Sequence, residues 1–134
     1  MKLYVDTNVF ISLIREETSD RRSLFSEALS FFRKAAQQKD EIITSKLSIK
    51  EISKICYLNK EATIESVKII FPEIKIVEIN KENEANYYKK GIHYPDSIHA
   101  STAKKENCDY LVTFNYKDFE KIKNEINAIE PNYY

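Results

Sequence analysis

The chain has 134 residues, of which 43% are hydrophobic and 31% are charged, a composition that fits one globular domain with a sizeable core. Its 21 basic and 21 acidic residues cancel, so the chain has no global attraction for nucleic acid and must hold any polyanion locally. No apolar run approaches the ~20 residues that cross a bilayer, and the first residues lack the features of a signal peptide, so we expect a cytoplasmic protein that does not enter the membrane.

Five short apolar runs without helical periodicity predict β-strands. They cover residues 3–5, 41–44, 74–79, 110–113 and 126–129. Between them, apolar residues recur at helical spacing over 24–35, 49–56 and 64–71. Strands that alternate with helices predict a single α/β domain, with a central parallel sheet of four or five strands flanked by helices on both faces. In such sheets, binding sites form beyond the carboxyl ends of the strands.

Asp6 lies where the first predicted strand ends, and an apolar run resumes only after Thr7 and Asn8. Thr7 and Asn8 are suited to capping the helix that begins near Val9. Asp6 can itself be a helix cap without chemistry, and this residue alone does not decide between a cap and a site.

Glu51 lies on the helix that follows the second strand, with Ser45 as the expected N-cap. On a helical wheel Glu51 falls at the margin of the apolar side, away from an opposite stripe of lysines, Lys46, Lys50 and Lys54. A carboxylate held at that margin is costly unless a positive group compensates it. A surface salt bridge to Lys54 is the alternative without function.

Asp96 lies at the start of a later helix, with Pro95 expected at the first helical position. The positive end of the helix dipole favours an ionised carboxylate there, with or without chemistry. Ala100 and Ala103 allow this helix to approach the sheet closely and bring Asp96 near the strand exits. His99 is expected to pack as a neutral histidine behind the site rather than to bind metal.

Asn115 and Asp118 follow the fourth predicted strand. Asn115 can cap a helix whose third residue is Asp118, and such reciprocal capping explains both residues without chemistry.

These acids nevertheless recur at positions that folding brings to one edge of one parallel sheet. Crowded carboxylates raise each other's pKa unless a cation occupies the space between them. Oxygen ligands without a Cys and His pattern favour Mg²⁺ or Mn²⁺ over Zn²⁺. The sequence therefore predicts a divalent-metal site built from carboxylates.

The chain resembles the PIN-domain ribonucleases, especially the small VapC-like toxins of prokaryotic toxin–antitoxin pairs. The likeness runs nearly end to end, through "VDTNVF", "SIKEI", "YPDSIHAS" and "LVTFNYKDF" in that order. It implies a parallel sheet of four or five strands and metal-dependent endonucleolytic cleavage of RNA. It also implies an antitoxin partner and a homodimer.

Carried over by position, the family's acids match Asp6, Glu51 and Asp96, and the fourth acid falls at Asn115. Asn115 keeps an oxygen ligand but removes one negative charge, which weakens the binding of a second metal ion. Asp118, three residues later, is an alternative source of the missing carboxylate.

Three further features are open to a functional interpretation. Thr7 and Thr113 lie beside the acids and can orient a carboxylate or a water through their hydroxyl groups. The lysine stripe of Lys46, Lys50 and Lys54 is either a solvated helix face or a local track for phosphates. Apolar residues within 24–36 occupy more than one helix face, which indicates core packing or a surface for an antitoxin segment or a second protomer.

Other functions are less consistent with the sequence. A receiver-like signalling domain needs an acidic pair near the first strand and a lysine at a later strand exit, and neither is evident. The intact Asp6, Glu51 and Asp96 argue against a scaffold protein that has lost catalysis through the change at Asn115. The single glycine, Gly91, cannot form a Walker or Rossmann phosphate loop. An RNA-processing nuclease of the same family remains an alternative to a toxin.

Overall fold

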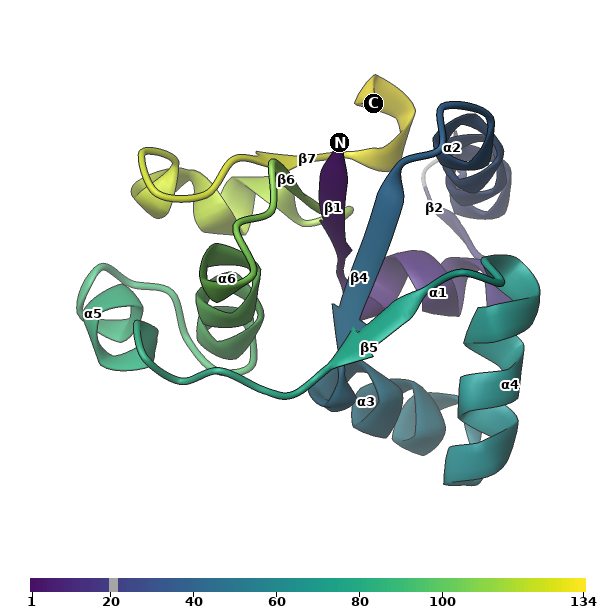
Figure 1. Cartoon of the computed structure of the whole chain (residues 1–134), viewed down its shortest axis with the longest axis horizontal. Coiled ribbons are helices and arrows are strands. Elements are labelled where there is room, and N and C mark those ends of the chain that lie inside the picture. Colours follow the sequence, from purple (N-terminus) through teal and green to yellow (C-terminus); the bar gives the residue numbers. More distant parts are fainter. Residues whose placement is uncertain (20–21) are drawn as a thin grey trace.

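In the computed structural model, which describes residues 1–19 and 22–134, five strands form one parallel sheet (Figure 1). In spatial order they are β5 (Lys75–Val77), β4 (Glu41–Ser45), β1 (Lys2–Val5), β6 (Tyr110–Val112) and β7 (Ala128–Ile129). All five predicted strands are present, although some are shorter than the apolar runs that predicted them. A short antiparallel pair, β2 (Thr18–Ser19) and β3 (Arg22–Ser23), was not predicted.

The central strand is β1, which pairs with β4 on one side and with β6 on the other. Leu3 lies opposite Ile42 of β4 and opposite Tyr110 of β6. Because all the neighbours in this sheet run parallel, their carboxyl ends lie at one edge. The residues that follow β1, β4 and β6 therefore meet at that edge.

Helical segments connect the strands and cover both faces of the sheet. The α-helices are α1 (Thr7–Ile14), α2 (Leu24–Gln37), α3 (Lys46–Cys56), α4 (Lys60–Ile70), α5 (Glu84–Lys89) and α6 (Asp96–Lys105). Two 3₁₀ segments follow, η1 (Tyr116–Ile122) and η2 (Pro131–Tyr133). Among the described residues, no helix has the length and apolar character needed to span a membrane.

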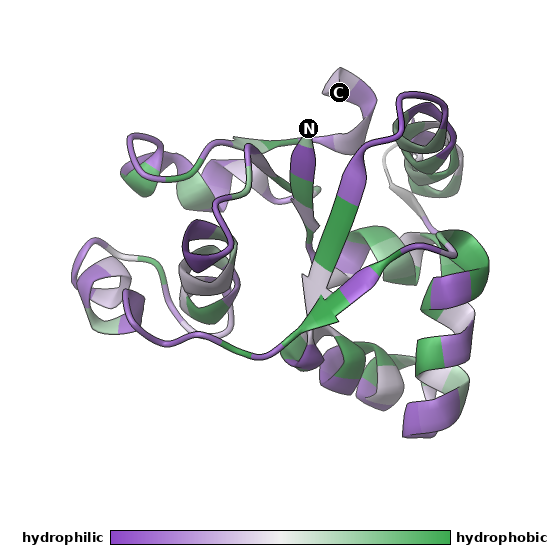
Figure 2. Ribbon diagram, viewed as in Figure 1, coloured by the Kyte–Doolittle hydropathy of each residue, from purple (hydrophilic) through white to green (hydrophobic). Residues whose placement is uncertain are grey.

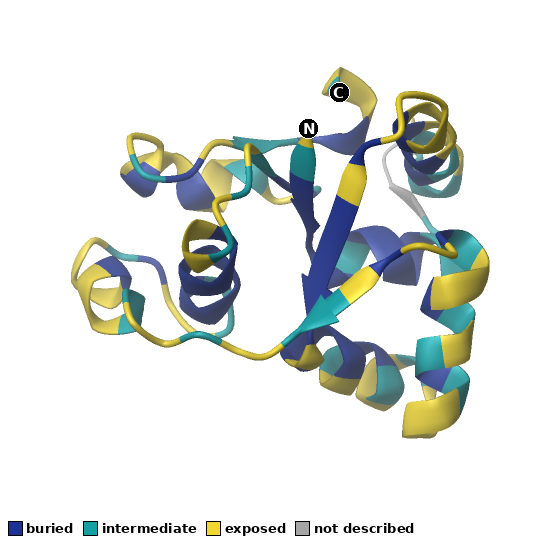
Figure 3. Ribbon diagram, viewed as in Figure 1, coloured by how far each residue is buried: buried dark blue, intermediate teal, exposed yellow. Residues whose placement is uncertain are grey.

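Alternation along the strands sends side chains into two separate cores, as a pleated sheet requires. On one face, Leu3 and Val5 pack with apolar residues of α1, α2, α3 and α4. On the other face, Tyr4 and Leu111 pack with residues of α5, α6 and η1. Hydrophobic residues lie toward the sheet (Figure 2), and the inner strands are buried while the outer surfaces of α4 and α5 are exposed (Figure 3). The predicted sheet with helices on both faces is confirmed.

Several helix ends differ from the expected ones. Asp6 rather than Thr7 or Asn8 is the N-cap of α1. Ser45 occupies the N-cap position of α3, but its hydroxyl accepts a hydrogen bond from Tyr4 instead of capping the helix. Pro95 precedes α6, so Asp96 is its first residue rather than its second.

The segment after β6 also differs, because η1 is a 3₁₀ helix and the side chain of Asn115 makes no capping hydrogen bond. The reciprocal capping expected for Asn115 and Asp118 is therefore wrong. The main-chain N–H of Asp118 instead donates to the carbonyl of Asn115. The short helix α5 was not predicted, since it buries only Tyr87 and offers no periodic pattern.

Candidate active site

Asp6 links the carboxyl ends of β1 and β6. It is 5% exposed, and its Oδ1 accepts from the N–H of Thr7 at 2.7 Å. Its Oδ2 accepts from Thr113 Oγ1 at 2.8 Å and from Asn8 Nδ2 at 3.4 Å. Asp6 is thus both a helix cap and an ionisable group held at the carboxyl edge of the sheet, so the two interpretations of this residue are compatible.

Thr113 and Asn8 form a small network behind Asp6. The fully buried Thr113 Oγ1 accepts from Asn8 Nδ2 and from the N–H of Asn115, both at 3.1 Å. Asn8 Oδ1 accepts from the N–H of Phe114 at 3.2 Å. Sequence reasoning assigned Asn8 only a capping role and missed this bridge, because nothing in the sequence indicates which loop lies beside α1.

Glu51 reaches the same edge from α3. Its Oε1 accepts from Thr7 Oγ1 at 2.8 Å and lies 2.7 Å from His99 Nε2. The alternative salt bridge between Glu51 and Lys54 is absent from the described part of the chain. Burial alone raises the pKa of Glu51, but the hydrogen bond and charge of His99, with the Thr7 hydroxyl, lower it below its ordinary value of 4.5.

His99 lies at the centre of this cluster, where its surroundings favour the charged form over the neutral histidine that we expected. It is 1% exposed, and its Nε2 lies 3.6 Å from Asp6 Oδ1. Burial alone lowers the pKa of His99, yet the Tyr4 hydroxyl, Asp6 and Glu51 together raise it well above its ordinary value of 6.5. The imidazolium therefore offsets part of the negative charge of the carboxylates around it.

Asp96 approaches the cluster from the first turn of α6. Burial and then the charge of Asp6 raise its pKa to about 6 from an ordinary value of 3.8. Asp118 and Glu51 add to this rise, and His99 opposes it. Within the described residues, the Asp96 side chain makes no hydrogen bond or ion pair. Asp96 is therefore a half-buried carboxylate that lacks a positive partner.

The other residues of the predicted site lie at its margin or outside it. Asn115 and Asp118 are exposed, and Asp118 shares a surface hollow with Asp96. Lys46, Lys50 and Lys54 are exposed on α3, where Lys46 forms an ion pair with Glu78.

The donor set suits a hard divalent cation, although it is not a finished cage. Across the described ranges, no three Asp, Glu, His or Cys side chains already converge as a metal site. Hydrogen bonds from Thr113 hold Asp6, and those from Thr7 and His99 hold Glu51. Asp96, with a raised pKa and no compensating partner, is the carboxylate for which a cation would relieve repulsion most.

The sequence matches the PIN domain family over residues 3–125, and the chain belongs to that family. The resemblance noted from the sequence motifs is thereby confirmed, and the receiver-like alternative is removed. Among curated protein sequences, none matches the chain.

Solved structures with a similar fold include toxin–antitoxin proteins. VapBC2 from Rickettsia felis, bound to a DNA fragment from its promoter, has 22% identity and a TM-score of 0.69, with 97% of this chain and 98% of that chain covered. A toxin–antitoxin complex from Klebsiella pneumoniae has 21% identity and a TM-score of 0.63, with 96% and 97% covered. VapC20 from Mycobacterium tuberculosis, a sarcin–ricin loop cleaving toxin, has 13% identity and a TM-score of 0.53, with 87% and 92% covered. At these identities the likeness concerns the fold.

Proposed function

We propose that this chain is a divalent-metal-dependent endoribonuclease and the toxin of a toxin–antitoxin pair. The observation that carries this proposal is the half-buried Asp96 carboxylate, whose pKa is raised by its burial and by Asp6, at the carboxyl edge of a PIN-domain sheet. Such an unpaired carboxylate among other acids is typical of a site that holds a cation. The toxin–antitoxin structures of similar fold support the biological role.

Asp6 and Asp96 would hold Mg²⁺ or Mn²⁺, with help from Glu51. When bound, the ion would activate a water and offset the negative charge of the attacked phosphodiester. The residues around the acids have orienting roles, because second-shell hydrogen bonds fix the direction of a ligand. Thr113 orients Asp6, and His99 with Thr7 orients Glu51.

Asn115 and Asp118 would act at the outer margin of the site. Asn115 supplies an oxygen without charge, so it makes a second ion more dependent on the phosphate of the substrate. Asp118 lines the same hollow as Asp96 and its charge raises the pKa of Asp96, so it would act on the same cation or on its water.

The lysine stripe would hold the RNA backbone beyond the site. Lys50 and Lys54 are exposed, whereas Lys46 is engaged by Glu78 and must exchange that partner for a phosphate. An exposed ion pair of this kind contributes little stability, so the exchange is inexpensive.

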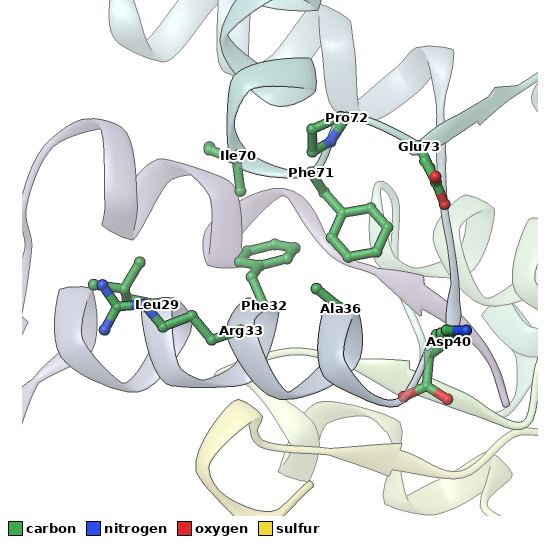
Figure 4. A pocket seen from close by; sticks show the side chains of 10 residues that line it. Leu29, Phe32, Arg33, Ala36, Asp40, Ile70, Phe71, Pro72 and Glu73 are labelled. Atoms are coloured by element: carbon green, nitrogen blue, oxygen red, sulfur yellow. The ribbon is translucent and has the colours of Figure 1, made fainter.

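The antitoxin would dock on the groove between α2 and the end of α4. A hollow of about 550 Å³ lies there, and Figure 4 shows Phe32 of α2 and Phe71 directed toward one another within it. Charged residues stand at its rim, among them Arg33 and Glu73. This is the surplus apolar face of residues 24–36, and it suits an apolar helix with charged flanks. A homodimer is also expected from the family resemblance.

The test is incubation of the purified protein with RNA and Mn²⁺ or Mg²⁺, beside Asp6→Asn and Asp96→Asn variants. Asp109→Asn is a matched control, since Asp109 accepts a hydrogen bond from the N–H of Lys2 at the opposite end of β1. We expect divalent-dependent cutting by the native protein and by Asp109→Asn only. Cutting that survives EDTA, or that both site variants retain, would contradict the proposal.

A further inference from the structure

A polar hollow of about 390 Å³ lies directly beside Asp96. Its walls come from two segments far apart in the sequence, the loop that precedes α6 and the 3₁₀ helix η1. The loop contributes Gly91, His93 and Tyr94, and η1 contributes Lys117 and Lys121. Because Asp96 forms part of its wall, whatever enters this hollow lies next to the candidate active site.

Two of the lining residues are lysines that form no direct ion pair, although Asp96 and Asp118 line the same hollow. Lys117 and Lys121 are exposed, and no carboxylate of the described residues lies within 4.0 Å of either. Four lysines of the described residues do pair with a carboxylate, as Lys90 does with Glu125 at 3.1 Å. The ammonium groups therefore remain available to an anion from solution.

The Lys121 side chain lies against the one glycine of the chain. Gly91 has a φ of +93°, and a Cβ at this position would lie 2.7 Å from Lys121 Nζ. The missing side chain thus lets the ammonium lie against the main chain at the edge of the hollow. Any other residue would displace it.

Aromatic rings border the same hollow. Tyr94 is 65% exposed, and the ring of His93 packs edge-on against Tyr88 at a centroid distance of 5.1 Å. An exposed aromatic ring beside unpaired cations is the combination by which proteins bind single-stranded nucleic acid, since every base can stack and every phosphate is an anion. Asp96 and Asp118 alone would repel a phosphate, and the two lysines offset that repulsion and supply the cations that a phosphate can contact.

We propose that this hollow binds the unpaired RNA nucleotide next to the cleaved bond, with its base on Tyr94 and its phosphate between Lys117 and Lys121. The placement of this nucleotide next to the cleaved bond rests on the proposed nuclease function. The stacked base identifies the substrate as single-stranded at that nucleotide, because a base held in a duplex cannot stack on a protein ring.

The test measures binding of a short fluorescein-labelled single-stranded RNA by anisotropy in EDTA, where no cutting interferes. We compare Tyr94→Ala with Tyr94→Phe, and Lys117→Gln/Lys121→Gln with Lys60→Gln/Lys68→Gln, a control that removes the same charge from α4. Thermal unfolding verifies that each variant is folded.

We expect Tyr94→Ala to weaken binding about tenfold and Tyr94→Phe to leave it nearly unchanged. Lys117→Gln/Lys121→Gln should lower the slope of log affinity against log salt by about 0.7, since the two lysines share one phosphate and each phosphate contact on a single strand contributes about 0.7. Unchanged binding in the Tyr94→Ala and Lys117→Gln/Lys121→Gln variants, or an equal loss in the α4 control, would overturn the proposal. RNA binding that behaves as expected, without cutting in Mn²⁺, would refute the nuclease function and leave this binding site standing.

Discussion

His99 Nε2 lies 2.7 Å from Glu51 Oε1, which places a buried cation among the carboxylates of the site. The Tyr4 hydroxyl donates to Ser45 Oγ at 2.8 Å and lies 2.7 Å from Nδ1 of His99. With Nε2 directed at the Glu51 carboxylate, the contacts at both ring nitrogens favour the imidazolium, as does the raised pKa of His99. The protein thus carries one positive charge of its own inside the acidic cluster.

Removing that charge should destabilise the protein in a pH-dependent way. We expect His99→Gln to lower the free energy of unfolding by about 2 kcal/mol in EDTA, because a charge-assisted hydrogen bond is lost. The folded-state pKa of His99 is raised above 6.5, so its contribution is fully present below that value and disappears as the pH rises through the folded-state pKa. Urea unfolding from mildly acidic to alkaline pH measures the difference, and a deficit that does not change with pH would mean that His99 is neutral.

Asp96 should affect stability in the opposite direction, because its ionised form destabilises the metal-free protein. Its folded-state pKa of about 6 exceeds the ordinary 3.8, so the metal-free protein loses stability as the pH rises between these values. Without metal, Asp96→Asn should therefore be more stable than the native protein at neutral pH, by about 1–2 kcal/mol after allowance for solvent screening. Near pH 4 the two proteins should unfold at similar urea concentrations.

Thermal unfolding of the native protein and of Asp96→Asn measures metal binding without an activity assay. Mn²⁺ should raise the thermal midpoint of the native protein, because a ligand that binds only the folded state stabilises it. Asp96→Asn should respond far less. Equal shifts in both proteins would show that the ion binds elsewhere.

Thr113 should influence the metal through Asp6. Thr113→Val removes the hydroxyl that donates to Asp6 Oδ2, and loss of such a second-shell contact costs about 10–100-fold in metal affinity. The Mn²⁺ concentration for half-maximal cutting should rise accordingly. Thr63→Val is the matched control, since the buried Thr63 hydroxyl donates to the carbonyl of Asn59 on α4. A similar rise in both variants would attribute the effect to stability alone.

The groove between α2 and α4 can be tested with one exposed position. Ala36 lies in the hollow, and Ala36→Arg should block an antitoxin helix by filling it. Gln37→Arg adds the same charge one residue away, outside the lining. Co-purification with a co-expressed candidate antitoxin should be lost only in the first variant, and retention by both would exclude this groove.

Much of the architecture could be predicted from local patterns. Apolar runs gave the five strands, and the parallel arrangement then required Asp6 and the residues after β4 and β6 to lie at one edge. Asp96 was harder to assign, since α6 starts away from a strand end and its approach depends on how closely Ala100 and Ala103 pack against the sheet.

The details that the sequence did not reveal are contacts across elements. The charge of His99 depends on Tyr4 and Glu51, which lie 95 and 48 residues away along the chain. The bridging role of Asn8 depends on Thr113, at a separation of 105 residues. No local pattern encodes such partners. Capping preferences were misleading for Ser45, whose hydroxyl accepts from the distant Tyr4, and for Asn115, whose exposed side chain makes no capping hydrogen bond.

The 2.8 Å hydrogen bond between Asp6 and Thr113 joins residues 107 positions apart, and β1 requires β6 as a neighbour. Almost the whole polypeptide must therefore be synthesised before Asp6 can contact Thr113. The candidate active site therefore forms late, because its acidic residues come together only once nearly all of the chain is available to fold.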